Sequence, residues 1–229
     1  MTLWPSYAAC QLPDGEIISL GQSPLQETDG EGAYTVRVYR STDDGHIHQQ
    51  AMATLVDLPK LHAGKTWVDH SVAVLQDGSL LAGLQGYFEN DVKARTFVVR
   101  STDRGETWHY LSTVAFDLDP GTACRMDGFC EPYLLVLPSG EVLCFMRSGG
   151  TYNATFTPLY LSRSIDGGQS WSHADVIADR GVWPNACRMA NGILADAYGV
   201  RVVFLVGGAL ATGTGLLLAL QRWPARVEI

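Results

Sequence analysis

The chain has 229 residues, of which 46% are hydrophobic and 17% are charged, so it is long enough and apolar enough to bury a globular core. Its formal net charge is −8 and its Lys and Arg residues are not clustered, which argues against a nucleic-acid partner. The five cysteines are odd in number and form no CxxC pair, which predicts free thiols. No metal ion or cofactor is expected.

Along the chain, the first recurring feature is a pair of apolar strands joined by a glycine turn. It occurs as CQLPDGEIISL, VAVLQDGSLLAGL and LLVLPSGEVLCFM, with turn glycines at Gly15, Gly78 and Gly140 that are 63 and 62 residues apart. A fourth opening, ACRMANGILADAY, places Gly192 a shorter 52 residues on. The chain is therefore predicted to hold three similar units and the start of a fourth.

Each of the three units continues into a Ser-x-Asp-x-Gly turn. The copies are RSTDDGHIHQQ, RSTDRGETWHY and RSIDGGQSWSH, and their serines are 60 and 63 residues apart. The second and third copies also carry a tryptophan, Trp108 and Trp171. The aspartate can accept hydrogen bonds from backbone N–H groups just downstream, and the glycine can adopt positive φ. The flanking β-forming residues then predict a hairpin.

Four short strands per unit are predicted, which in the third unit span residues 133–137, 141–147, 159–164 and 170–176. No amphipathic helical period of ten residues precedes residue 200. A repeated four-stranded unit of about 40 to 60 residues is typical of a β-propeller blade, which hides its strand edges by radial repetition. A β-solenoid or a β-sandwich is the alternative fold.

The complete turn at Ser101–Trp108, and its nearly complete copy at Ser164–Trp171, resemble the Asp box of the sialidase (neuraminidase) superfamily, also called the BNR repeat. The resemblance covers residues 1–199 and implies an all-β, six-bladed propeller in which Asp boxes are structural turns. Three blades and the start of a fourth make an incomplete ring, because a closed one would need about 370 residues at this period. The open blade edges would favour self-association.

Candidate site residues follow from the propeller geometry, in which the first strands of all blades surround one axis. The positions nine residues before the turn glycines are Ser6, Asp69, Glu131 and Trp183. Glu131, followed sixteen residues later by Arg147, resembles a segment of the family's active site. There the glutamate is the base that activates a tyrosine nucleophile, and the arginine binds the substrate carboxylate. The resemblance thus implies these roles for Glu131 and Arg147.

The chemistry fits a sugar such as sialic acid, which carries a carboxylate on its anomeric carbon. A neutral tyrosine activated by a glutamate avoids repulsion by that carboxylate, and a planar guanidinium binds it in bidentate fashion. We therefore predict an exo-alpha-sialidase-like glycoside hydrolase with a carbohydrate ligand. Asp69 and His70 are candidate substrate-binding residues, although a capped strand start explains them as well. Arg147 could also simply neutralise Glu131.

Departures from the family pattern predict an incomplete active site. Leu3 stands where the family's first arginine is expected, and Glu27 and Asp29, in a Gly-rich loop, are the only carboxylates near the expected position of the acid. The tyrosine and the last arginine would lie in later blades. Two alternative functions remain, a non-catalytic BNR propeller that binds glycans or proteins and a fragment without independent function.

Residues 200–229 are predicted as a separate apolar tail. Val202–Leu220 contains nineteen residues without a charge, which is long enough for a transmembrane helix, and a small residue recurs in it every fourth position. A reading-frame slip is the alternative, because one added G in one coding of residues 199–203 gives Gly-Arg-Pro-Gly-Gly, a common continuation in the family. No signal peptide is recognisable, and the sequence predicts no compartment.

Overall fold

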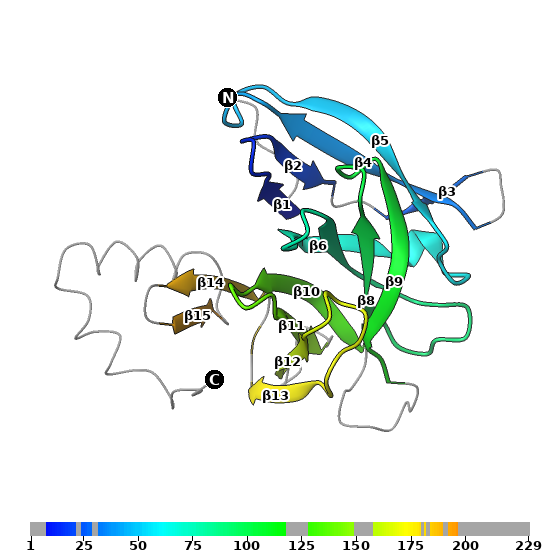
Figure 1. Ribbon diagram of the computed structural model, residues 1–229. Helices are drawn as coiled ribbons and strands as arrows, with labels where there is room; N and C mark the ends of the chain where they lie inside the picture. Colours follow the sequence, from blue (N-terminus) through cyan, green and yellow to red (C-terminus); the bar gives the residue numbers. More distant parts are fainter. Residues whose placement is uncertain are drawn as a thin grey trace.

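The computed structural model describes residues 8–21, 24–28, 32–117, 128–148, 158–179, 181, 184–189 and 192–196. These residues form an all-β structure, in which the 3-10 helix η1 (Ala63–Lys65) is the only helical element of the described part (Figure 1). No helix there is long and apolar enough to cross a membrane, and residues 202–220 lie outside the described residues. The predicted fold class, an all-β propeller, is confirmed below by the topology and the comparisons.

The strands form three four-stranded antiparallel units and a hairpin. Unit one consists of β1 (Ala8–Gln11), β2 (Ile17–Leu20), β4 (Tyr34–Ser41) and β5 (Gln49–Val56), with the short β3 (Gln26–Glu27) paired to β4. Unit two consists of β6 (Trp67–Val74), β7 (Leu80–Gly86), β8 (Arg95–Ser101) and β9 (Thr107–Ala115). Unit three consists of β10 (Phe129–Val136), β11 (Val142–Ser148), β12 (Leu159–Ser164) and β13 (Asp175–Ala178). The hairpin is β14 (Asn185–Met189) with β15 (Gly192–Asp196).

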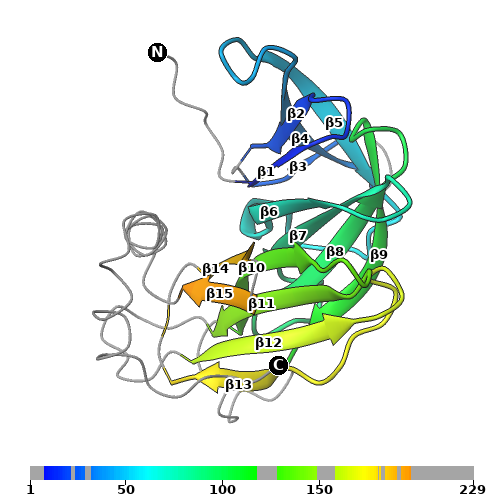
Figure 2. The same ribbon diagram turned by 60° about the vertical axis from the view of Figure 1, so that its left-hand side comes forward.

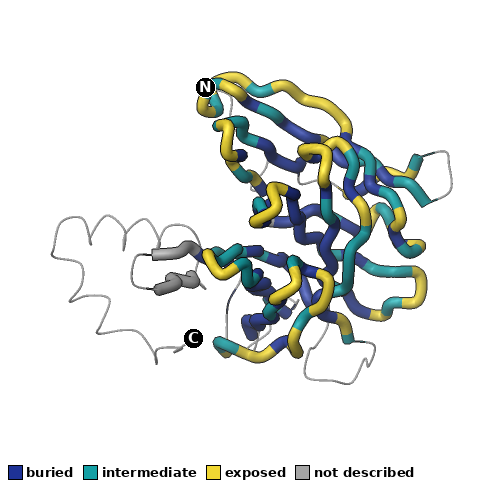
Figure 3. The backbone as a smooth tube through the Cα atoms, in the orientation of Figure 1, coloured by how far each residue is buried: buried dark blue, intermediate teal, exposed yellow. Residues whose placement is uncertain are grey.

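The three units stack in chain order, with the first strand of each unit on the same side (Figure 2). Strand β6 packs between β1 and β10. Along β7, alternate side chains enter two different cores, because successive residues of a strand point to opposite faces. Leu80 and Leu84 pack against unit one, whereas Leu81 packs against unit three. In Figure 3 the buried residues accordingly follow the strands through the stack, and exposed residues follow the turns.

At the outer side, units one and two are also joined by hydrogen bonding between their last strands. Strands β5 and β9 pair in parallel, with Thr54 opposite Thr107, Leu55 opposite Trp108 and Val56 opposite His109. The two units therefore form one continuous nine-stranded sheet, whereas unit three forms a separate sheet of four strands.

The Ser-x-Asp-x-Gly turns have the structure that the sequence predicts. In the second copy, the Asp103 carboxylate accepts the backbone N–H of Thr107 at 2.9 Å and the Ser101 hydroxyl at 2.7 Å. Gly105 has φ +83°, a conformation that glycine adopts without strain. Trp108 is completely buried, donates from Nε1 to the carbonyl of Gly105 at 3.1 Å and packs in the core between units one and two. The turn is thus scaffold, as predicted.

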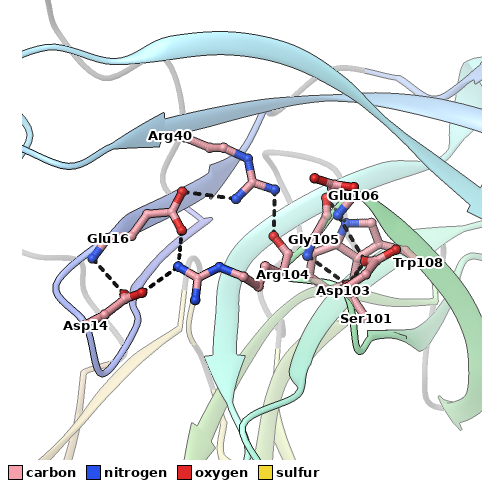
Figure 4. A network of polar contacts seen from close by, with 9 residues as sticks. All are labelled: Asp14, Glu16, Arg40, Ser101, Asp103, Arg104, Gly105, Glu106 and Trp108. Carbon is pink, nitrogen blue, oxygen red and sulfur yellow. Dashed lines mark hydrogen bonds and ion pairs between the residues drawn. The ribbon is translucent and has the colours of Figure 1, made fainter.

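The same turn also docks on the preceding unit (Figure 4). Arg104 donates from Nη2 to Asp14 at 2.8 Å and also pairs with Glu16, both in the β1–β2 turn region of unit one. Arg40 of β4 donates to the backbone carbonyl of Arg104 at 2.6 Å and pairs with Glu16 at 3.1 Å. Because Arg104 and Asp14 are both exposed, the ion pair between them contributes little to stability.

The third copy corrects one predicted boundary. The last strand of unit three was expected at residues 170–176, but β13 begins at Asp175. The N–H groups of Gln169 and Ser170 donate to the Asp166 carboxylate, at 2.9 Å each, as the N–H of Thr107 does to Asp103 in the second copy. In unit two, β9 begins directly at Thr107 because β5 pairs with it there. The six-bladed ring and the division at residue 199 stay predictions.

These hydrogen bonds make the third turn sensitive to acid. The hydroxyl and the N–H of Ser170 lower the pKa of Asp166 to about 2 from 3.8. A carboxyl whose folded-state pKa is depressed stabilises the fold above its unfolded pKa, and this contribution is lost as the pH falls through the folded value. We expect Asp166→Asn to lower the urea midpoint at pH 5, and the difference from the wild type to shrink towards pH 2. A difference that is constant with pH would contradict the assignment.

Candidate functional site

Three ionisable side chains of the predicted site lie together, on strands of units two and three. They are Asp69 of β6, Glu131 of β10 and Arg147 of β11. Arg147 binds Glu131 with two hydrogen bonds, from Nε to Oε2 at 2.5 Å and from Nη2 to Oε1 at 2.7 Å. The charges of Glu131 and Arg147 both act on the pKa of Asp69. Asp69 is 4% exposed and Glu131 is 7% exposed, so both carboxyl residues are buried, whereas the side chain of Arg147 is partly exposed.

Two β-bulges at equivalent places aim the carboxyl groups. The ladder of β6 with β7 shifts between Val68 and Val72, and that of β10 with β11 shifts between Cys130 and Tyr133. Arg147 lies opposite Cys130, so in a regular ladder Glu131 would point to the other face of the sheet. The bulge and the left-handed φ of +51° at Glu131 turn its side chain towards Arg147 instead.

The positive φ of Glu131 is costly for a residue with a Cβ, and such strain persists only where neighbouring groups hold it. Here the N–H of Glu131 donates to Oε1 of Gln85 on β7, at 2.7 Å. A second hydrogen bond joins β6 to β10, because the hydroxyl of Ser71 accepts the N–H of Leu134 at 2.7 Å. Unit two thus positions the site residues of unit three. Neither Gln85 nor Ser71 is among the residues predicted from the sequence, where their only signal is a polar residue within an apolar strand.

The carboxyl groups of Asp69 and Glu131 have different electrostatic surroundings. Burial, and next the neighbouring Glu131, raise the pKa of Asp69 well above its usual range, and Arg147 acts in the opposite direction. Oδ2 of Asp69 is buried and has no hydrogen-bond partner within the part of the chain that the structure describes. Glu131, in contrast, accepts two charge-assisted hydrogen bonds. Two carboxyl groups in such different surroundings are suited to different roles in acid–base chemistry.

The structure does not place the other predicted site residues in this cluster, as far as it describes them. His70 follows Asp69 on β6, but its side chain is outside the described part. Glu27 is exposed on β3. Four further positions also lie outside the described residues, namely Leu3, Ser6, Asp29 and Trp183. No group of three His, Cys, Asp or Glu side chains that could bind a metal ion occurs among the residues that the structure describes.

Comparison with solved structures places the fold among large β-propeller proteins. A protein of unknown function from Dyadobacter fermentans superposes with a TM-score of 0.60 at 20% identity, over 85% of this chain and 60% of that one. An α-L-arabinanase from Penicillium chrysogenum, solved with arabinobiose, gives 0.57 at 17% identity, over 82% and 55%. The sialidase Hz136 from a Hadza microbial source gives 0.50 at 18% identity, over 76% and 33%. These similarities concern the fold.

The chain spans about 60% of the length of the Dyadobacter protein and 55% of the arabinanase. Comparison with curated proteins gave no significant match. A family model described as a BNR repeat-like domain matches residues 11–196, which include units two and three, the hairpin β14–β15 and all of unit one except Ala8–Cys10. With its three Asp-box turns and its stacked four-stranded units, the chain belongs to the BNR repeat-like domain family.

Proposed function

We propose that this chain carries part of the active site of a glycoside hydrolase that cleaves a terminal carboxylated sugar such as sialic acid. The observation that supports this most directly is the cluster that the buried Asp69 and Glu131 form with Arg147, on strands of two neighbouring propeller units. Glu131 is the general base, and Arg147 binds the carboxylate of the sugar. The solved arabinanase and sialidase are propellers of the same kind that act on sugars, which adds support at the level of fold.

The geometry sets a condition on carboxylate binding. A guanidinium has five N–H donors on two usable edges, and Glu131 takes the edge formed by Nε and Nη2. Nη1 donates to the carbonyl of Ser148 at 3.5 Å, so a substrate carboxylate that binds the second edge, formed by Nη1 and Nη2, must share Nη1 with that carbonyl. Glu131 would then orient Arg147 in addition to acting as a base.

The second candidate function is a non-catalytic propeller that binds glycans or proteins. The observation in its favour is the bidentate pair itself, because Glu131 and Arg147 satisfy much of each other's charge. The chain also spans only about half the length of the Penicillium arabinanase, so residues from later blades would have to complete a catalytic site. Self-association through open blade edges is one way to supply a neighbouring surface.

Hydrolysis of fluorogenic glycosides distinguishes the two functions. We expect the purified chain to release the fluorophore from an α-sialoside faster than from an α-L-arabinofuranoside. Glu131→Gln should lower kcat by about 10²–10⁴-fold, the usual contribution of a general base. Glu141→Gln is the matched control, because Glu141 pairs with Arg163 in the same sheet but is partly exposed. Glycan binding on an array without turnover of any glycoside would support the second function and contradict the first.

A further inference from the structure

We propose that Asp69 is the proton donor of this site, the group that protonates the glycosidic oxygen as the sugar leaves. This role rests on the proposed function and goes beyond the substrate-binding role that the sequence suggests for Asp69. It also places the acid on the inner strand of unit two rather than in the Gly-rich loop of Glu27 and Asp29.

The geometry of Asp69 points to a ligand. Asp69 is 4% exposed and lies at the β-bulge of β6, the place equivalent to that of Glu131 one unit later. Its Oδ2 atom has no hydrogen-bond partner in the described part of the chain. An unpaired buried oxygen is destabilising, and folded proteins retain such groups where strain, chemistry or a bound molecule accounts for them. A glycosidic oxygen or a sugar hydroxyl would supply the missing partner.

The surroundings of Asp69 favour its protonated form. Among the described side chains, the charged groups that act on it are Glu131 from β10 and Arg147 from β11. Burial and the negative charge of Glu131 raise the pKa of Asp69. Arg147 opposes this shift, but its Nε and Nη2 are already bonded to Glu131. One carboxyl group thereby accepts an ion pair, whereas the surroundings of the other favour its protonated form.

The resulting step balances in protons and electrons. The proton of the Asp69 carboxyl moves to the glycosidic oxygen while the bond from the anomeric carbon to that oxygen breaks, and the bonding electron pair stays on the oxygen, which leaves as an alcohol. Water attacks the anomeric carbon and gives one proton to Glu131. The products are the free sugar and the alcohol. Proton exchange with solvent then returns Asp69 to its acid form and Glu131 to its carboxylate.

Infrared spectroscopy tests the protonation of Asp69 without reference to activity. We expect the carbonyl stretch of a protonated carboxyl group in the wild-type protein at pH 7 and its absence in Asp69→Asn. In Glu131→Gln, the band should disappear at a lower pH than in the wild type, because a negative charge is removed and Arg147 becomes available to Asp69. Asp77→Asn is the control, since Ser79 and Arg100 bond Asp77 as a carboxylate at the surface. Absence of the band in the wild type would overturn the proposal.

Kinetics then test the transfer itself. Asp69→Asn should lower kcat by at least about 10²-fold for a sialoside with an alkyl alcohol as leaving group, as expected for the loss of a general acid. The loss should be much smaller for an aryl leaving group, which departs without protonation. Equal losses of kcat in Asp69→Asn for both leaving groups would overturn the proton-donor role. The proposed function would still be supported in that case if Glu131→Gln lowers kcat. If the wild type hydrolyses neither glycoside, the proposed function fails, and the proton-donor role fails with it.

Discussion

Replacing Trp108 with alanine is expected to lower the free energy of unfolding by about 3–5 kcal/mol, the usual cost of removing a buried tryptophan side chain. Trp108 is completely buried and fills the core that units one and two share. The substitution also leaves the carbonyl of Gly105 without the N–H donor that it has at 3.1 Å. Urea denaturation followed by circular dichroism measures the loss.

Trp171→Ala provides the matched control for this prediction. Trp171 occupies the same position in the third turn and donates to the carbonyl of Gly168, but it is only partly buried against the core of units two and three. A smaller loss is therefore expected. Equal losses for the two tryptophans would show that burial between the units does not determine the contribution of the turn.

Arg147→Met is expected to destabilise the protein by about 3–5 kcal/mol, because it leaves Glu131 buried without its cationic partner. The double variant Glu131→Gln with Arg147→Met removes both charges and should recover most of this loss. Thermal or urea unfolding of the two single variants and the double variant completes a double-mutant cycle.

The pair of Arg163 and Glu141 serves as the comparison for Arg147 and Glu131. It joins β12 to the start of β11 at 3.0 Å, but both side chains are partly exposed to water. Arg163→Met should therefore cost less than about 1 kcal/mol. If Arg147→Met and Arg163→Met lowered the free energy of unfolding equally, burial would not explain the contribution of the Arg147–Glu131 pair to stability.

The repeat determined how much of the fold was predictable from sequence. Turn glycines and Ser-x-Asp-x-Gly turns are local signals, because a positive φ and a short side-chain hydrogen bond depend on neighbouring residues. The units, the role of Asp103 and the burial of Trp108 could therefore be predicted. The parallel pairing of β5 with β9 could not, since it depends on contacts between residues more than fifty positions apart.

The candidate site was predictable as a set of positions but not as a geometry. Counting back from the turn glycines selected Asp69 and Glu131, which the structure places in one cluster with Arg147. The bulges shift the register at both positions, and no residue pattern in the sequence marks them. The support from Gln85 and the unpaired oxygen of Asp69 likewise depend on the packing of one unit against the next.

The placement of Trp108 has a consequence for synthesis on the ribosome. The face of unit one that contains Ile18 and Leu55 is covered by a side chain that is translated 52 residues after Val56, where unit one ends. A nascent chain that has completed unit one alone thus presents an uncovered apolar surface, the kind of surface that chaperones bind.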